Sequence, residues 1–147
     1  MAKLLNLKKL NVLNHQVDCE CSKSCFIEVG QLLQESDLTN LKPTLKMYGQ
    51  YILGKYQFRL SKKSDPKKHL ELANSHFDEV FRIAGTFQIR RPKYWFKRIH
   101  TKYELAKLYN HEDAAALLLK AKELVEPAHT LFPDNSSITW MHNELFK

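Results

Sequence analysis

Three cysteines and a histidine crowd into eleven residues near the start of the chain, and these residue types could do chemistry. The stretch HQVDCECSKSC contains His15, Cys19, Cys21 and Cys25. Histidine and cysteine are ligands that zinc prefers, but structural zinc sites usually join two separate ligand pairs. Here a single residue separates Cys19 from Cys21. We therefore expect no metal, and we interpret the segment as a turn with reduced thiols; zinc and a redox switch are the alternatives.

The number and spacing of the cysteines, together with the N-terminal residues, indicate a reducing compartment. Three cysteines is an odd number, and their crowding suits no disulfide framework for 147 residues. The N-terminal residues 1–13 are amphipathic and lysine-containing, without the features of a signal peptide. No apolar run approaches the roughly 20 residues that a membrane span needs. We expect a cytoplasmic or nuclear protein without a membrane partner.

Apolar residues recur at three and four positions along most of the chain, which is typical of amphipathic helices. Proline or acidic residues mark several expected helix starts, and Gly85 marks an expected end. The pattern predicts an all-α fold in one domain, residues 1–147, with an N-terminal helix and cysteine turn at 1–25 and helical hairpins over 26–147. The expected helices cover about seven segments, namely residues 4–13, 25–36, 42–60, 66–84, 92–109, 112–131 and 138–146.

Some local signals make the expected helix boundaries more specific. Asp65 followed by Pro66 predicts an N-cap and a first-turn proline. Pro127 falls inside an apolar pattern and predicts a kink or an early helix end. Short polar breaks between long helices imply that neighbouring helices are antiparallel.

Two of the expected helix pairs share a spacing of small and large residues. The residues that carry the pattern are Leu53, Gly54, Ala73, Phe77 and Val80 in one pair and Leu105, Ala106, Tyr109, Ala121, Val125, Ala128 and Pro133 in the other. This pattern resembles the tetratricopeptide repeat, with the charged stretch SKKSDPKK as an insertion. The resemblance implies stacked antiparallel helix pairs, capped or docked on a larger partner. An unrelated helical bundle is the alternative.

The cysteine turn followed by helices carries a second resemblance. The segment CECSKSC and the helices after it, over residues 15–147, are similar to the helical part of separase, the cysteine protease that opens cohesin. They are also similar to the post-SET cysteines and helical C-terminal domain of SET- and MYND-type lysine methyltransferases. Both families keep their catalysis in domains that this segment does not match. The resemblance implies a scaffold that binds an inhibitory chaperone or a cohesin-linked partner.

A basic stretch supplies the candidate binding residues. The net charge of the chain is +7, which permits contact with acidic proteins or nucleic acid. Basic residues interleaved with aromatics can hold phosphates and stack bases, although aromatics at helical spacing usually belong to a core. We expect an acidic protein partner and not nucleic acid. The candidate partner-binding residues are Arg90, Arg91, Lys93, Lys97, Arg98 and Lys102.

The chain shows no pattern that predicts catalysis. The histidines outside the cysteine turn are scattered, and neither a glycine-rich phosphate loop nor a nucleophile elbow occurs. We expect no enzyme activity, no cofactor and no small-molecule substrate. The predicted function is a scaffold that binds a peptide or protein in a groove between helix pairs. The alternatives are a non-catalytic separase-like fragment and a basic nucleic-acid-binding protein. Trp140 and Phe146 could form a terminal cap or a docking surface.

Overall fold

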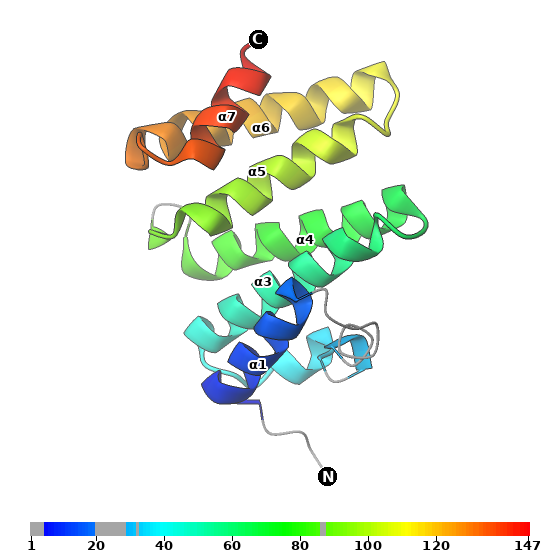
Figure 1. Cartoon of the computed structure of the whole chain (residues 1–147), viewed down its shortest axis with the longest axis vertical. Coiled ribbons are helices and arrows are strands. Elements are labelled where there is room, and N and C mark those ends of the chain that lie inside the picture. The colour runs from blue at the N-terminus through cyan, green and yellow to red at the C-terminus, as the bar shows by residue number, and fades with distance from the viewer. Residues whose placement is uncertain (1–4, 20–28, 32, 86–87) are drawn as a thin grey trace. The chain divides into compact units, whose positions relative to one another are not determined.

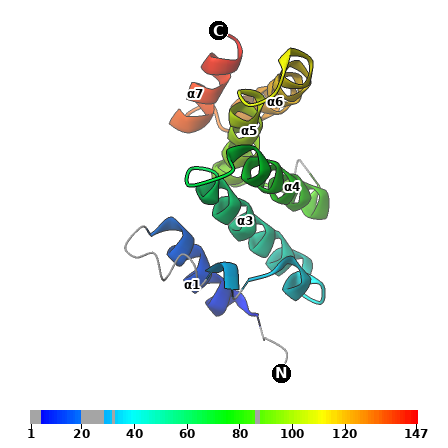
Figure 2. The same ribbon diagram turned by 90° about the vertical axis from the view of Figure 1, so that its right-hand side faces the viewer.

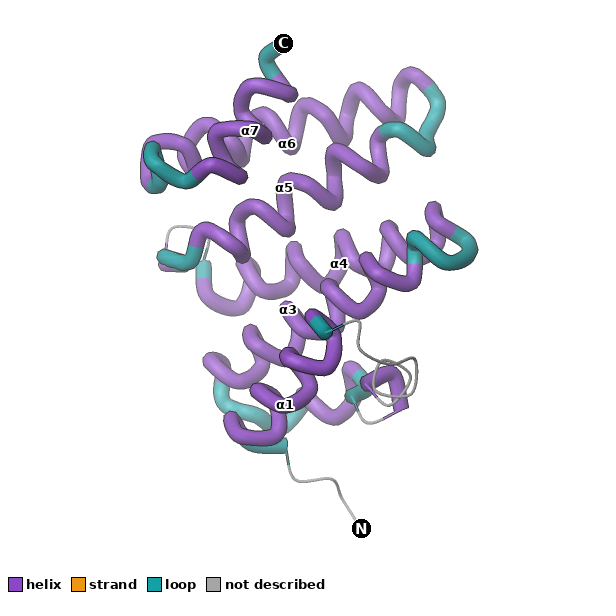
Figure 3. The backbone as a smooth tube through the Cα atoms, viewed as in Figure 1, coloured by secondary structure: helices purple, strands orange, loops and turns teal. Residues whose placement is uncertain are grey.

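Every described element of the chain is a helix. The computed structural model describes residues 5–19, 29–31, 33–85 and 88–147, and no strand occurs among them (Figure 3). This confirms the predicted all-α fold. The chain divides into two compact units, Met1–Thr86 and Phe87–Lys147, where the sequence predicts one domain. In the described part no helix is long and apolar enough to span a bilayer.

Unit 1 is organised around a helical hairpin. Its elements are α1 (Leu7–Asp18), the short 3₁₀ helix η1 (Glu35–Leu38), α3 (Pro43–Leu60) and α4 (Pro66–Ala84). Helices α3 and α4 pack against each other along their length, and α1 and η1 pack against α3 (Figure 1). The helix expected at 25–36 lies largely outside the described residues, although residues 29–31 are helical.

Helix α1 is longer than the sequence pattern predicts. The expected end was near Leu13, whereas α1 continues to Asp18. Its start is fixed by Asn6, whose side-chain oxygen accepts a hydrogen bond from the backbone N–H of Lys9 at 2.9 Å. Its extension follows from Val17, which continues the apolar stripe and is fully buried.

The predicted N-cap at Asp65, in the turn between α3 and α4, is wrong. Helix α4 begins at Pro66 as expected, but Asp65 adopts a φ of 45° and its side chain caps no backbone N–H. A left-handed residue lets the chain reverse tightly here, and aspartate tolerates that conformation better than most residues. The predicted end at Gly85 is confirmed, because Gly85 has a φ of 79° that suits glycine.

The approach of α3 to α4 depends on a missing side chain at Gly54. A Cβ atom placed on Gly54 would lie 2.6 Å from Cε1 of Phe77, a buried ring on α4. That ring also lies 5.9 Å, centroid to centroid, from Tyr51 on α3. Figure 2 shows the two helices side by side. The small residue opposite a large one is the packing that the repeat-like spacing predicts for this pair.

Replacing Gly54 by alanine tests this contact. Alanine normally favours a helix over glycine by about 1 kcal/mol. Here the added methyl group meets the Phe77 ring, so we expect Gly54→Ala to lower the free energy of unfolding by about 1–3 kcal/mol. Urea unfolding measures the change. The same substitution in a Phe77→Leu background should cost less, and an equal cost in both backgrounds would contradict the packing described.

A buried lysine attaches α1 to α3. Nζ of Lys55 lies 2.8 Å from Oδ1 of Asp18 and also donates a hydrogen bond to Oδ1 of Asn14, both on α1. The ammonium lies 4.8 Å from the ring centroid of Tyr51. Arg59, one turn further along α3, donates to the backbone oxygen of Asp18 at 3.1 Å. Positive groups at a helix C-terminus are also favoured by the helix dipole.

The two ends of the Lys55–Asp18 pair should respond differently to mutation. The side chain of Lys55 is 7% exposed and that of Asp18 is 53% exposed. Asp18→Ala removes the carboxylate from a buried ammonium, and we expect a loss of about 1–2 kcal/mol in unfolding free energy. Lys55→Met fills the same volume, removes the buried charge and should cost less. Urea unfolding of both variants is the measurement, and a larger cost for Lys55→Met would contradict this account.

Unit 2 contains three helices around its own core. These are α5 (Pro92–Ala106), α6 (His111–Leu131) and α7 (Ser136–Leu145), and α6 packs against both others. Asn110 and Asn135 cap α6 and α7 through their side-chain oxygens. The core of unit 2 includes the buried residues Trp95, Ile99, Ala121, Val125, Ala128, Ile138 and Met141.

Two expected boundaries in unit 2 differ from the structure. Helix α5 ends at Ala106 and not at Tyr109, because the last three residues form a turn that leads to the Asn110 cap. Helix α6 does not end early at Pro127 but continues to Leu131. Ala128 beside that proline is fully buried, so packing holds the helical conformation there.

Candidate protein-interaction surface on α5 and α7

The described residues of the cysteine segment belong to no metal site. His15 lies on the last turn of α1 and is exposed, so it belongs to a helix and not to the turn. Cys19, the residue after α1, is disulfide-bonded, so the reduced thiol expected there is wrong. Zinc binds the thiolate form of cysteine, and the disulfide therefore counts against a zinc ligand at Cys19. Cys21 and Cys25 lie outside the described residues, among which no three potential ligands gather to hold a metal.

The six predicted partner-binding residues differ in their exposure. Arg90, Arg91 and Lys93 are exposed at the start of α5, whereas Lys97 and Arg98 are half-buried. Lys102 is only 2% exposed, which corrects its assignment to a solvent-facing patch. Lys102 lies seven residues after Trp95 and thus on the buried stripe of α5, where its long aliphatic stem is covered.

A second stripe of α5 carries aromatic side chains toward α7. Phe96, His100 and Tyr103 follow each other at four and three positions, and Lys93 precedes Phe96 on the same stripe. The rings of Phe96 and His100 stack with centroids 5.0 Å apart. Trp140 of α7 meets His100 at 6.0 Å and Tyr103 at 6.3 Å, in both cases nearly perpendicular. Such edge-to-face pairs are favourable arrangements of aromatic rings.

Trp140 remains accessible despite these contacts. It is 45% exposed and is one of the large apolar side chains that the described part leaves in water. Its ring is held by α5 on one side and is open to water on the other. We call the surface formed by Lys93, Phe96, His100, Tyr103, Trp140 and Glu144 the α5–α7 face.

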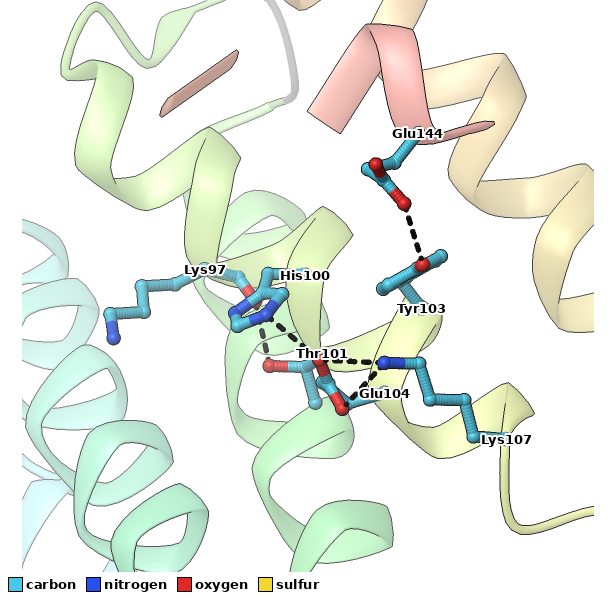
Figure 4. A network of polar contacts seen from close by, with 7 residues as sticks. All are labelled: Lys97, His100, Thr101, Tyr103, Glu104, Lys107 and Glu144. Atoms are coloured by element: carbon cyan, nitrogen blue, oxygen red, sulfur yellow. Dashed lines mark hydrogen bonds and ion pairs between the residues drawn. The ribbon is translucent and has the colours of Figure 1, made fainter. Parts of the chain in front are cut away.

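Polar contacts fix the rim of the α5–α7 face (Figure 4). The hydroxyl of Tyr103 donates to Oε2 of Glu144 at 3.1 Å, which joins α5 to α7. Glu104 lies 3.1 Å from Nε2 of His100 and 3.3 Å from Nζ of Lys107. That ammonium lies 4.5 Å from the Tyr103 ring centroid. The side chains are therefore positioned by one another and not only by the helices.

Contacts at this rim shift the pKa values of two side chains, Glu144 and Tyr103. The pKa of Glu144 is lowered, first by its hydrogen bond with Lys147 and second by that with Tyr103. The pKa of Tyr103 is raised, first by desolvation and then by its hydrogen bond to Glu144. A lowered carboxyl pKa means that the stabilisation is present near neutral pH and is lost as the pH falls through the folded-state pKa of Glu144.

Removing one hydroxyl tests this connection between α5 and α7. We expect Tyr103→Phe to raise the pKa of Glu144 toward its ordinary value, because the carboxylate loses a donor. A pH titration of the side-chain carboxyl signals by NMR measures the pKa of Glu144 and, as a control, that of Glu79. The pKa of Glu79, lowered first by its hydrogen bond with Arg82 in unit 1, should stay unchanged. An unchanged Glu144 titration would contradict the contact.

Part of this face differs from what helical periodicity predicts. The apolar pattern of residues 92–109 places Tyr103 on one side of the helix with Trp95 and Ile99, whereas Tyr103 lies beside that buried stripe and is half-buried. The spacing of Lys93, Phe96, His100 and Tyr103 indicates that these side chains share one side of the helix. It does not predict the contact with Trp140, because that residue lies on a helix some 40 residues further along the chain.

The chain matches no protein-family model, no curated protein and no solved structure. The tetratricopeptide and separase resemblances therefore stay predictions. The contacts between α5 and α7 show that the two helices run in the same direction. His100 contacts Trp140, and Tyr103 contacts Glu144 further along both helices.

Proposed function

We propose that the chain is a protein-interaction module whose α5–α7 face binds a segment of an acidic protein. The observation that carries the proposal is Trp140, which is 45% exposed and held edge-on against His100 and Tyr103. Tryptophan and tyrosine are enriched among the residues that dominate binding energy in protein interfaces. A large apolar side chain held in place loses little conformational freedom on binding, which favours affinity.

The preference for an acidic partner rests on the charges beside this face. Lys93 lies two turns before His100 on the same stripe of α5, which is about 10 Å along the helix axis. Arg90 and Arg91 are exposed just before the helix begins. The partner segment would place an apolar side chain on Trp140 and acidic side chains near Lys93 and Arg91. Such charges steer association and select among partners.

A parallel pair of helices is the arrangement expected of successive first helices in stacked hairpins. It supports the tetratricopeptide-like array as our interpretation of α5 and α7. In that interpretation the α5–α7 face lines the groove in which an extended or helical segment binds.

Two variants of the full chain test the proposal against a display library of acidic peptides. Selected peptides should bind the wild-type chain, and Trp140→Ala should weaken binding at least about tenfold, as truncation of an interface anchor does. The double change Arg91→Glu and Lys93→Glu should weaken binding to a similar extent and more strongly at low salt. Fluorescence anisotropy of labelled peptides measures the affinities.

A charge-matched control separates a local site from net charge. The double change Lys62→Glu and Lys68→Glu alters the same number of exposed charges in unit 1 and should leave peptide binding unchanged. An equal loss in this control would overturn the proposal. So would a single-stranded oligonucleotide that binds more tightly than every peptide and is released by salt, the behaviour of phosphate contacts.

A further inference from the structure

The turn that joins α3 to α4 carries a cluster of lysines that the proposed function does not use (Figure 1). We call residues 62–68, with the sequence KKSDPKK, the α3–α4 tip. All seven residues are exposed. Four of them are lysines and one is an aspartate, which gives the tip a formal charge of +3.

The chain reverses direction within the tip, and this reversal concentrates its charges. The backbone N–H groups of residues 63 and 64 both donate to the backbone oxygen of Leu60, which closes the end of α3. Asp65 then adopts its φ of 45°, and α4 begins with the next residue. One pair of lysines, residues 62–63, therefore precedes the reversal, and the other pair, residues 67–68, follows it directly.

Two of these lysines carry the contacts that we infer with a partner. Lys62 and Lys68 are both exposed. Nζ of Lys62 lies 5.6 Å from the ring centroid of the buried Phe58, so this side chain is held beside the end of α3. Lys63 and Lys67 have further contacts within the chain, and we therefore count them only for the positive potential of the tip.

The residue types of the tip indicate which polyanion it suits. The sequence KKSDPKK contains no aromatic and no large aliphatic residue. Single-stranded nucleic acid is held in large part by bases that stack on aromatic rings, which the tip cannot provide. Helices that lie on a membrane add apolar side chains that enter the lipid. A duplex keeps its bases stacked inside and offers its phosphates, which lysines can contact.

Charge density favours the same partner. A DNA duplex carries one negative charge per roughly 1.7 Å of its axis, and each phosphate that a lysine neutralises releases condensed counterions. An extended acidic peptide carries at most one charge per roughly 3.3–3.6 Å. Lysines that are gathered in one turn therefore gain more from a duplex than from an acidic peptide.

We propose that the α3–α4 tip binds the phosphate backbone of double-stranded nucleic acid without reading its sequence. Lys62 and Lys68 contact phosphates, while the negative charge of Asp65 at the centre of the tip opposes binding. DNA and RNA duplexes share this backbone chemistry. The proposal goes beyond the α5–α7 face and does not depend on it.

The test is fluorescence anisotropy of labelled DNA and RNA duplexes of about 20 base pairs with the full 147-residue chain. Two to four neutralised phosphates predict a slope of log K against log salt between about −1.8 and −3.6, so the Kd should rise by about 7- to 50-fold from about 50 to about 150 mM salt. The double change Lys62→Gln and Lys68→Gln should reduce the magnitude of this slope by about 1.8. Tighter binding of one duplex identifies DNA or RNA as the source.

Asp65→Asn is the sharper variant, because misfolding does not imitate a gain in affinity. Asparagine tolerates a positive φ, and the Asp65 side chain caps no backbone N–H, so the turn should be kept. Loss of the negative charge should tighten duplex binding by about threefold at low salt. Asp134→Asn makes the same change of charge at an exposed position in the turn before α7 and should leave the affinity unchanged.

A second matched control removes two lysines elsewhere. Lys8 and Lys120 are exposed on α1 and α6, and replacing both by glutamine should leave the salt slope unchanged. An equal loss of slope in this control, or no gain in folded Asp65→Asn, would overturn the proposal. Circular dichroism checks that each variant keeps its helices.

Other polyanions complete the test at equal concentrations of negative charge. The probes are poly-glutamate, a single-stranded oligonucleotide and phosphatidylcholine vesicles with about 20% phosphatidylserine. Tighter binding of any of these than of both duplexes would contradict the proposed partner. Trp140→Ala should leave duplex binding unchanged, so failure here is distinguishable from failure of the proposed function.

Discussion

Helix α3 can lie against α4 only as closely as the residue at position 54 allows. Glycine there leaves room for the ring of Phe77, so the two antiparallel helices approach closely at this contact. In this register Gln50 meets His76 on one side of the contact and Gln57 meets His69 on the other. The same close approach places Lys46 of α3 and Arg82 of α4 at the wall of one open pocket. The polar contacts between α3 and α4 thus depend on an apolar fit.

Much of this fold is predictable because its signals are local. Prolines at 43, 66 and 92 each stand at the start of a helix, and Gly85 follows the end of another. Periodic apolar residues then define which side of each helix is buried. Asp65 shows the limit of such signals, since a residue suited to capping adopts instead the left-handed conformation that the turn requires.

The candidate surface was only partly predictable, because exposure depends on what covers a helix. The basic stretch was found from composition, yet the periodicity that buries Trp95 also buries Lys102. The meeting of Trp140 with His100 and Tyr103 requires the path of the chain through α6, which no local pattern contains. The disulfide at Cys19 was missed because cysteine spacing was judged against a framework for the whole fold.

The chain's two tryptophans lie in opposite environments. Trp95 is fully buried and its indole N–H donates to the backbone oxygen of Ile89 at 2.9 Å, whereas Trp140 stands half in water. A water-soluble quencher therefore reaches one indole and not the other. The intrinsic fluorescence of the chain consequently contains a constant component from the core of unit 2 and a second component that reports whatever covers the α5–α7 face.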